Sequence, residues 1–119
     1  MRGLRIVLTG TEEERELVAR VKVAMTAPTL DLSGRTSLGA LGALVGSCRL
    51  VVSNDTGIAH VADALATPSV VIFRAGAPEV ERWAPLDREL HRVMCSDDRA
   101  DEVVEAAVEL LQEAPVHAA

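Results

Sequence analysis

Apolar residues follow two different periods along this chain, and the change of period predicts strands alternating with helices. Short continuous apolar runs, rich in valine and isoleucine, are typical of strands buried on both faces of a sheet. Stretches with apolar residues three or four positions apart are typical of helices packed on one side. The predicted strands are Leu4–Leu8, Thr29–Leu32, Arg49–Ser53, Ser69–Phe73 and His91–Met94. The predicted helices are 12–25, 37–47, 56–65 and 100–112, with a short helical turn near 79–83.

Two of these helices carry features that can be checked locally. Thr11 precedes the first helix and Glu14 follows three residues later, which is the spacing of a capping box. The second helix contains Gly39, Gly42 and Gly46, each of which costs about 1 kcal/mol relative to alanine in a helix interior. We expect these glycines to allow close packing of the helix on the sheet.

The alternation of strands and helices predicts a three-layer α/β domain with a mainly parallel sheet. The chain has 119 residues, which suits one domain, and we assign residues 1–113 to it and residues 114–119 to a loose tail. No run is long and apolar enough to span a membrane, and Met1-Arg-Gly leads directly into a strand rather than a signal peptide. We therefore expect a cytoplasmic protein.

Charge and composition exclude several function classes. The net charge is −6, and Phe73 and Trp83 are the only aromatic residues, so a basic surface with stacking rings for nucleic acid is missing. Cys48 and Cys95 are far apart and lack metal-ligand spacing, which favours two reduced thiols in or near the core.

The candidate chemistry lies where the third predicted strand meets the third helix. Asp55, Thr56, Gly57 and His60 gather at this junction, and ligands of open parallel sheets bind beyond the carboxyl ends of the strands. The first turn of a helix offers free backbone N–H groups and the positive end of its dipole, so it suits phosphate. The alternative is structural: Asp55 as an N-cap and His60 as a half-buried helix residue.

An aspartate after a central strand in a chain of this length also suggests a response-regulator receiver domain. That chemistry requires an acidic cluster after the first strand, a hydroxyl after the fourth and a lysine after the fifth. Here the first strand ends in Thr9-Gly-Thr11, the strand ending at Phe73 is followed by Arg74-Ala75, and the only lysine is Lys22. We reject the receiver interpretation.

The chain instead resembles the family-nine glycosyltransferases, the lipopolysaccharide heptosyltransferases. Its segment Leu50–His60 is similar to the family signature, in which a strand ends in Asp-Thr-Gly-x-x-His. Further matches follow the order of the family. They are Leu8–Gly10 with Glu14–Leu17, then Asp31–Leu38, Thr67–Phe73 and Arg82–Pro85.

This resemblance implies one half of a two-lobed enzyme of the GT-B type, in which two Rossmann-like halves face each other across a cleft. The chain resembles the C-terminal, donor-binding half, and the N-terminal half with the acceptor surface and general base is missing. The opening strand of the C-terminal half is also missing from the match. Since the first strand is central in a doubly wound sheet, we expect a gap or an exposed edge. The N-terminal lobe, a partner chain or a homodimer through that edge would complete it.

The resemblance also assigns roles to individual residues. Thr56, Gly57 and His60 would hold the diphosphate, with His60 stabilising the leaving phosphate, whereas Asp55 would contact a sugar hydroxyl. The resemblance further implies donor-binding roles for Gly10, for Glu14 at the ribose, and for Thr36 and Leu38 near the base.

The sequence also allows purely structural roles for these and other residues. Glu14 is equally a capping-box residue, and Thr36 equally a helix start. Arg35 is by default a surface arginine, and Trp83 a packing residue. His91 and His117 are interpreted as incidental.

We therefore predict the donor-binding portion of an inverting glycosyltransferase that takes a heptose-like sugar from an ADP-sugar or related nucleotide sugar. No catalytic residue of the reaction is assigned to this chain beyond His60, and no metal or other cofactor is expected. The chain alone is expected to be inactive. The alternative is a truncated or split half-domain that folds by pairing with a partner chain.

Overall fold

The computed structural model describes residues 3–54, 56–74, 85 and 87–113. It divides into two compact units, residues 1–41 and residues 42–119, which are described one at a time below. The predicted helical turn near 79–83 and the predicted tail 114–119 lie outside the described residues.

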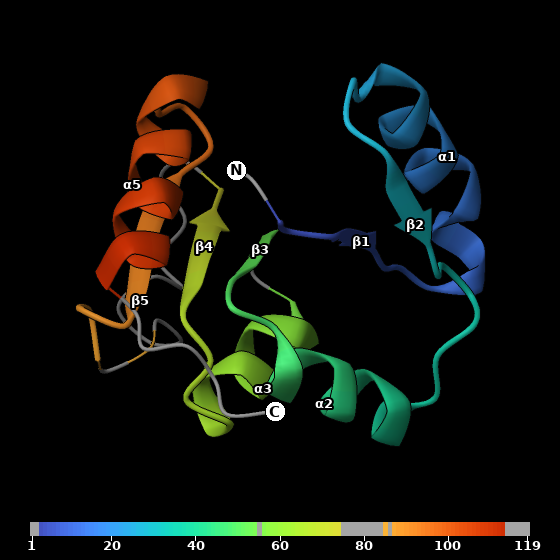
Figure 1. Ribbon diagram of the computed structural model, residues 1–119, viewed down its shortest axis with the longest axis horizontal. Helices are drawn as coiled ribbons and strands as arrows, with labels where there is room; N and C mark the ends of the chain where they lie inside the picture. The colour runs from blue at the N-terminus through green and yellow to red at the C-terminus, as the bar shows by residue number, and fades with distance from the viewer. Residues whose placement is uncertain (1–2, 55, 75–84, 86, 114–119) are drawn as a thin grey trace. The chain divides into compact units, whose positions relative to one another are not determined.

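The first unit is a short parallel strand pair with one helix (Figure 1). It contains β1 (Ile6–Leu8), a 3-10 turn (Glu12–Glu14), α1 (Arg15–Ala24) and β2 (Thr29–Asp31). The capping box predicted from Thr11 and Glu14 is confirmed, because the Thr11 N–H donates to Glu14 Oε1 at 2.9 Å. This box fixes where the chain turns from β1 into the helix.

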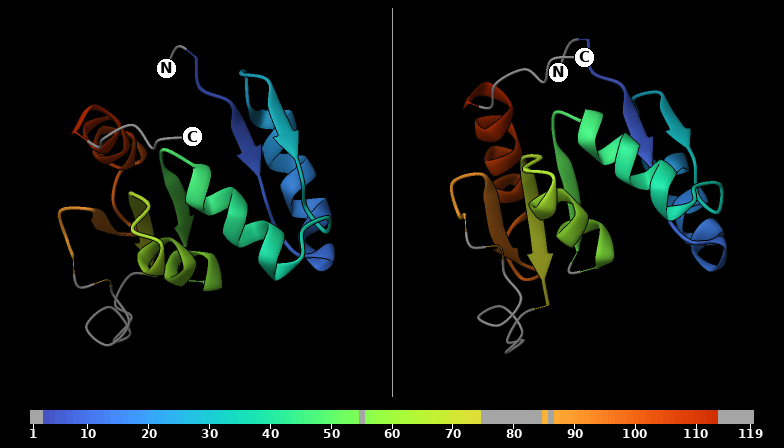
Figure 2. Two further views of the ribbon diagram at one scale, coloured as in Figure 1. Left: turned by 60° about the horizontal axis from the view of Figure 1, so that its bottom comes forward. Right: turned by 90° about the horizontal axis from the view of Figure 1, so that it is seen from below.

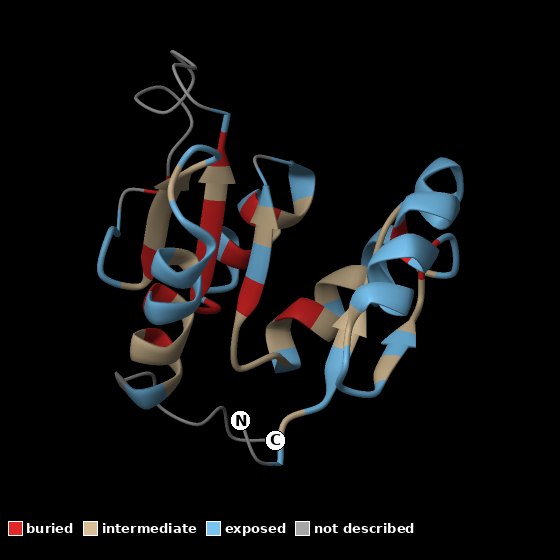
Figure 3. Ribbon diagram, turned by 90° about the horizontal axis from the view of Figure 1, so that it is seen from above, coloured by how far each residue is buried: buried red, intermediate tan, exposed pale blue. Residues whose placement is uncertain are grey.

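Few apolar side chains are buried in the first unit. Val18 of α1 is the one buried apolar residue among the described residues of this unit. Leu17 and Val21 lie on the same predicted helix face but are 55% and 43% exposed. Leu30 of β2 is 56% exposed. Figure 3 shows the same contrast, with α1 mostly exposed and β4 of the second unit mostly buried.

The second unit is a three-stranded parallel sheet with helices. The strands pair in the order β3–β4–β5, with every strand parallel to its neighbour. Apart from the turn near 79–83, the predicted elements of this part are present among the described residues, with boundaries that agree to within two residues. They are α2 (Leu38–Ser47, which crosses the boundary between the units), β3 (Val51–Asn54), α3 (Gly57–Ala64), β4 (Ser69–Phe73), β5 (His91–Cys95) and α5 (Ala100–Glu113).

Helices cover both faces of this sheet, as Figure 2 shows. On one face, Ala59 of α3 packs against Val71 and Phe73 of β4. On the other face, Val70 of β4 packs against Ala106 and Leu110 of α5. Neighbouring residues of β4 therefore point to opposite faces, and both faces are buried, which explains why its sequence is continuously apolar.

Two arginine side chains bind α5, one from β5 and one from the segment just before β3. Arg92 Nη1 of β5 lies 2.8 Å from Glu109 Oε2. Arg49 Nη2 donates to the Leu111 carbonyl at 3.2 Å, in the last turn of the helix. A cation at a helix C-terminus also complements the negative end of the helix dipole.

The predicted α/β class with parallel strands is confirmed. Among the described residues, β1 pairs with β2 in the first unit, and β3, β4 and β5 pair in that order in the second.

The explanation given above for the glycines of α2 is wrong for two of them. A Cβ built at Gly39 or at Gly42 would meet no described atom within 4 Å. At Gly46 it would lie 3.6 Å from Leu65 Cδ1, an ordinary contact. Close packing therefore does not require glycine at these positions.

Candidate functional site

The helix α3 is preceded by Thr56, whose backbone is extended and whose hydroxyl does not cap the helix. Thr56 occupies the N-cap position with φ −139° and ψ 177°, and its side chain makes no capping hydrogen bond. Gly57 is the first helical residue. Because β3 ends at Asn54, this helix begins at the carboxyl end of the parallel strands, where ligands of such sheets bind.

The start of α3 is open to an incoming ligand. A Cβ at Gly57 would meet no described atom within 4 Å, and Thr56, Gly57 and His60 are all exposed. The first turn contains no acidic residue. The structure thus brings Thr56, Gly57 and His60 together at one helix start whose dipole favours an anion.

The structure differs in two respects from the structural alternative, in which Asp55 is the N-cap and His60 is half-buried. The N-cap position of α3 is taken by Thr56, and His60 is exposed rather than half-buried. Asp55 lies outside the described residues, so its predicted contact with a sugar hydroxyl stays a prediction.

Gly10 and Glu14 lie together in the first unit, just beyond β1. A Cβ at Gly10 would lie 3.0 Å from Val18 Cγ2 and 3.3 Å from Glu14 Cβ, so a larger residue here would require these side chains to move by a few tenths of an ångström. Glu14 accepts from the Thr11 N–H through Oε1. The structural role of Glu14 is therefore confirmed, and its predicted ribose contact stays a prediction.

The loops after β1 and β2 are hydrogen-bonded to each other. The Gly34 N–H donates to the Gly10 carbonyl at 2.9 Å. The Ser33 hydroxyl and N–H both donate to Asp31 Oδ1, at 2.6 and 2.8 Å, and these bonds lower the pKa of Asp31 below 3.8. Both loops lie at the carboxyl ends of their strands.

The other residues of this part that are predicted to bind the nucleotide-sugar donor come after the loop that follows β2. Thr36 is half-buried and Leu38 is 78% exposed. At the start of α2, Ser37 Oγ accepts from the Ala40 N–H at 3.1 Å. Arg35 is exposed, as its default interpretation predicts. Trp83 and His117 lie outside the described residues.

The interpretation of His91 as incidental is wrong. His91 is 1% exposed, and its Nδ1 lies 2.7 Å from Ser69 Oγ, which is also buried. Its Nε2 lies 3.5 Å from Asp63 Oδ1 of α3. Burial lowers the pKa of His91 below 6.5, against smaller raising effects of Asp63 and Asp87.

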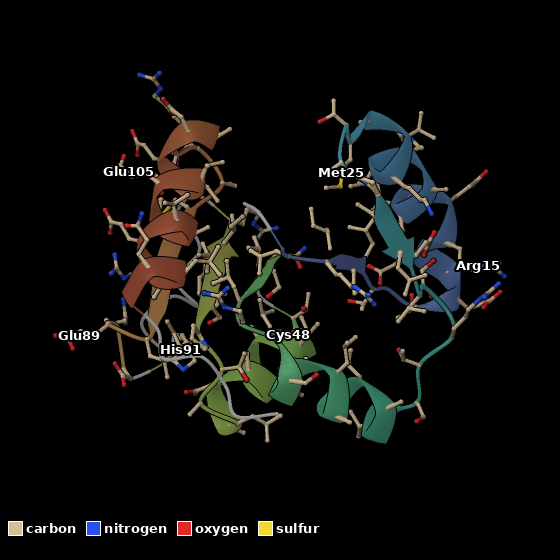
Figure 4. The ribbon with its side chains drawn as sticks, viewed as in Figure 1. Arg15, Met25, Cys48, Glu89, His91 and Glu105 are labelled. Carbon is tan, nitrogen blue, oxygen red and sulfur yellow. The ribbon has the colours of Figure 1, made fainter. Side chains whose placement is uncertain are left out.

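This Ser69–His91–Asp63 arrangement is structural. Figure 4 shows His91 at the start of β5, and Ser69 is the first residue of β4, so both lie at the strand ends opposite to the start of α3. With Ser69 fully buried, no substrate reaches its hydroxyl. The one local signal for this pair is that a serine and a histidine each open a strand.

The two cysteines are free and half-buried. Burial raises the pKa of the Cys48 thiol. Among the described residues, no three histidine, cysteine, aspartate or glutamate side chains group to hold a metal ion. The described helices include none that is both long and apolar enough to cross a membrane.

Comparison with known proteins decides the family. The family model for glycosyltransferase family 9 (heptosyltransferase) matches residues 1–111. This chain belongs to glycosyltransferase family 9. The predicted resemblance to this family is thereby confirmed.

The matches to curated relatives cover shorter stretches of this chain than the family model does. Lipopolysaccharide heptosyltransferase 2 of Escherichia coli K12 is 31% identical over 81 residues, which cover 65% of this chain and 23% of that protein. Lipopolysaccharide heptosyltransferase 3 of E. coli is 30% identical over 101 residues, covering 82% of this chain and 29% of that protein. The chain thus spans about a quarter of the length of these relatives.

Two solved structures share the fold. The family-nine glycosyltransferase of Veillonella parvula matches with a TM-score of 0.80 and 23% identity, over 94% of this chain and 38% of its own. The E. coli ADP-heptose heptosyltransferase II matches with a TM-score of 0.78 and 25% identity, over 93% and 37% respectively. Both similarities support the predicted GT-B type of α/β architecture.

Proposed function

We propose that this family-nine chain binds the diphosphate of a nucleotide-sugar donor at the start of α3. The observation that carries the proposal is the open, uncapped first turn of α3, with Thr56, Gly57 and His60 exposed beside one another. Backbone N–H groups and the helix dipole would hold the phosphates. His60, one turn after Thr56, would donate to the departing phosphate and offset its developing charge.

The full reaction that we propose is inverting transfer of a heptose-like sugar from an ADP-sugar to a glycan or glycolipid acceptor. The name of the E. coli ADP-heptose heptosyltransferase II supports this donor class. Because the chain spans about a quarter of its curated relatives, we expect it to bind donor without turning it over. Donor binding would rely on the helix start and require no metal ion.

Thermal unfolding in the presence of ADP tests donor binding directly. A ligand that binds only the folded state raises its stability, by about 2.7 kcal/mol at a hundred times Kd. The melting temperature should therefore rise with ADP concentration, equally in EDTA, and rise much less with adenosine. No shift at saturating ADP would contradict the proposal.

A charge substitution at the helix start separates binding from folding. Gly57→Glu places a carboxylate where the phosphates would lie, and the space around Gly57 admits a side chain. A carboxylate in the first turn also favours the helix by about 0.3–1 kcal/mol. We expect the variant to fold as well as the parent chain and to lose ADP binding at least tenfold. Ala64→Glu, at the other end of α3, is the matched control and should bind ADP like the parent.

A second candidate function is a half-domain that becomes fully ordered against a partner chain. The observation that favours it is the first unit, where Val18 is the one buried apolar side chain among the described residues, while Leu17, Val21 and Leu30 are exposed. Hydrogen exchange tests this candidate. In the isolated chain, amides of α1 should exchange much faster than those of β4. Equal protection in a monomer would contradict it.

A further inference from the structure

The helix α3 connects the proposed phosphate site at its first turn with a buried polar cluster at its last turn. Thr56 and Gly57 begin the helix. Asp63 lies in the last turn, with Oδ1 3.5 Å from Nε2 of His91 in β5. The helix has eight residues and is therefore about 12 Å long. Because a helix this short and regular moves as one body, a shift of its last turn also shifts its first turn.

The apolar contacts between α3 and the sheet are made by small side chains of the helix. Ala59 and Ala62 are its buried residues, and Ala59 packs against Val71 and Phe73 of β4. Methyl groups interlock little with a sheet, and hydrophobic contacts have no preferred direction. The exact position of α3 along the sheet therefore depends on its polar contacts and on the chain that leads out of it.

Backbone hydrogen bonds fix the turn from α3 into β4. The Ala66 N–H donates to the Asp63 carbonyl at 3.2 Å. The Thr67 N–H donates to the Ala62 carbonyl at 2.9 Å. These bonds hold the last turn of the helix near the start of β4. The side chain of Asp63 adds a contact with β5, one strand further along the sheet.

A carboxylate is unfavourable at the position that Asp63 occupies. The C-terminal end of a helix carries the negative end of the helix dipole, which repels an acidic side chain. Asp63 is the acidic residue of α3, and it lies in the last turn rather than the first. The stability of the helix therefore disfavours this residue, whereas its contact with His91 gives it a role.

The neighbours of His91 determine which ring nitrogen carries the proton. An ionised Asp63 can only accept, so it favours an N–H at Nε2. Nδ1 then accepts from the Ser69 hydroxyl, 2.7 Å away. The charged groups facing the ring are Asp63 of α3 and Asp87 of the turn before β5, and β4 contributes the uncharged Ser69. A second proton on the ring would place an N–H against the buried Ser69 hydroxyl and strengthen the attraction to Asp63.

We propose that His91 is a positioning residue for the nucleotide-sugar site. In its neutral form it holds the last turn of α3, through Asp63, in the position in which the first turn accepts the diphosphate. His91 itself does not contact the nucleotide sugar, because it lies at the strand ends opposite to the start of α3. This inference rests on the proposed function and adds regulation to it, since a proton taken up by His91 lowers the affinity for the nucleotide sugar.

Two substitutions at Asp63 test the contact while changing the charge equally. Asp63→Asn keeps an oxygen that faces Nε2 of His91, and Asp63→Ala removes it. Both variants should fold, because alanine is a strong helix former and the side chain is partly exposed, and urea unfolding checks this. In calorimetric titration of the full chain at pH 7.5, the alanine variant should bind ADP about fivefold more weakly than the asparagine variant.

Glu89→Ala is the matched control for charge. Glu89 is exposed in the turn before β5, where Figure 4 labels it together with His91. Its removal takes away one negative charge and leaves the contact between Asp63 and His91 in place. This variant should bind ADP like the parent chain.

Electrostatics without positioning predicts the opposite sign for Asp63. Loss of its negative charge would strengthen the binding of an anion, and would do so equally in both variants. Equal binding by the two variants, or tighter binding by the alanine variant, therefore overturns the inference and leaves ADP binding at α3 standing. A parent chain that binds no ADP overturns the proposed function and this inference together.

An NMR titration of the His91 ring, with and without saturating ADP, tests the same coupling without a variant. Coupling between two sites is reciprocal, so if the neutral ring favours ADP, bound ADP must lower the pKa of His91. The negative charge of ADP acting through space would raise this pKa instead. A pKa that rises or stays unchanged overturns the inference, and this answer holds even if the alanine variant does not fold.

Discussion

The hydroxyl of Ser69 and Nδ1 of His91 lie 2.7 Å apart at the start of two neighbouring strands, with both side chains almost completely buried. This bond joins β4 to β5 at the end of the sheet opposite to the proposed donor site. The other ring nitrogen of His91 faces Asp63 of α3, so one imidazole links two strands and a helix. Burial of this group makes the stability of the fold dependent on pH.

The free energy of unfolding should fall when the pH drops below about 6.5, the ordinary pKa of histidine. Burial lowers the pKa of folded His91, so between the folded and unfolded pKa values the unfolded chain binds the extra proton. Stability is therefore complete above the unfolded pKa and declines toward the folded pKa. Asp31, whose pKa is lowered from 3.8, loses its contribution only at more acidic pH. Urea unfolding between pH 7.5 and pH 5 measures the decline.

A variant assigns this decline to His91 rather than to the other two histidines. His91→Gln should unfold with a smaller pH dependence between pH 7.5 and pH 5 than the parent chain. An NMR titration of the parent chain gives the same answer without a variant. A His91 ring that titrates at or above 6.5 would contradict the explanation.

Removing the serine hydroxyl should destabilise the second unit without affecting its topology. Ser69→Ala leaves the buried Nδ1 of His91 without its partner, which costs about 1–3 kcal/mol. Ser53→Ala is the control, because Ser53 lies on the half-buried strand β3 and its hydroxyl donates to the neighbouring Asn54 carbonyl. That change should stay within about 0.5 kcal/mol. Urea unfolding at pH 7.5 compares them, and equal values would show that the buried bond contributes nothing.

The sequence predicted local structure well, because the signals involved are local. A continuous apolar run located β4, and the Thr11–Glu14 spacing located the start of the first helix. The Thr56–Gly57 junction was likewise found from residue types at the end of a strand. In each case the physical cause lies within a few residues of the observed feature.

Features that depend on distant partners were not predicted. The role of His91 depends on Ser69, 22 residues away in the chain, and no periodicity connects them. Helical spacing placed Leu17 and Val21 on one face, but burial of that face requires a partner surface that the described residues of the first unit do not supply. The glycines of α2 suggested close packing, which also depends on a distant surface.

Two glycines, Gly34 and Gly39, should respond to alanine with opposite signs. Gly34 has φ +69°, and a Cβ there would collide with Glu12. Gly34→Ala should therefore destabilise the first unit by about 1–2 kcal/mol or more. Gly39 is helical, with open space around it, so Gly39→Ala should stabilise by about 0.5–1 kcal/mol. Chemical denaturation of both variants measures the difference. A stabilising Gly34→Ala would show that the turn after β2 differs from the one described.

Glu14 carries a structural role that is observed and a ligand role that is proposed, and one substitution separates them. Glu14→Gln keeps an oxygen able to accept from the Thr11 N–H, because glutamine also serves in capping boxes. Stability should therefore stay within about 0.5 kcal/mol of the parent.

A neutral amide accepts less strongly from a pair of ribose hydroxyls, since hydrogen bonds to ionised groups are roughly twice as strong. ADP affinity should fall about tenfold, which corresponds to about 1.4 kcal/mol. Calorimetric titration with ADP, beside urea unfolding of the same sample, measures both quantities. Unchanged affinity would leave Glu14 with its capping role alone, and a large loss of stability would mean that the charge itself supports the turn.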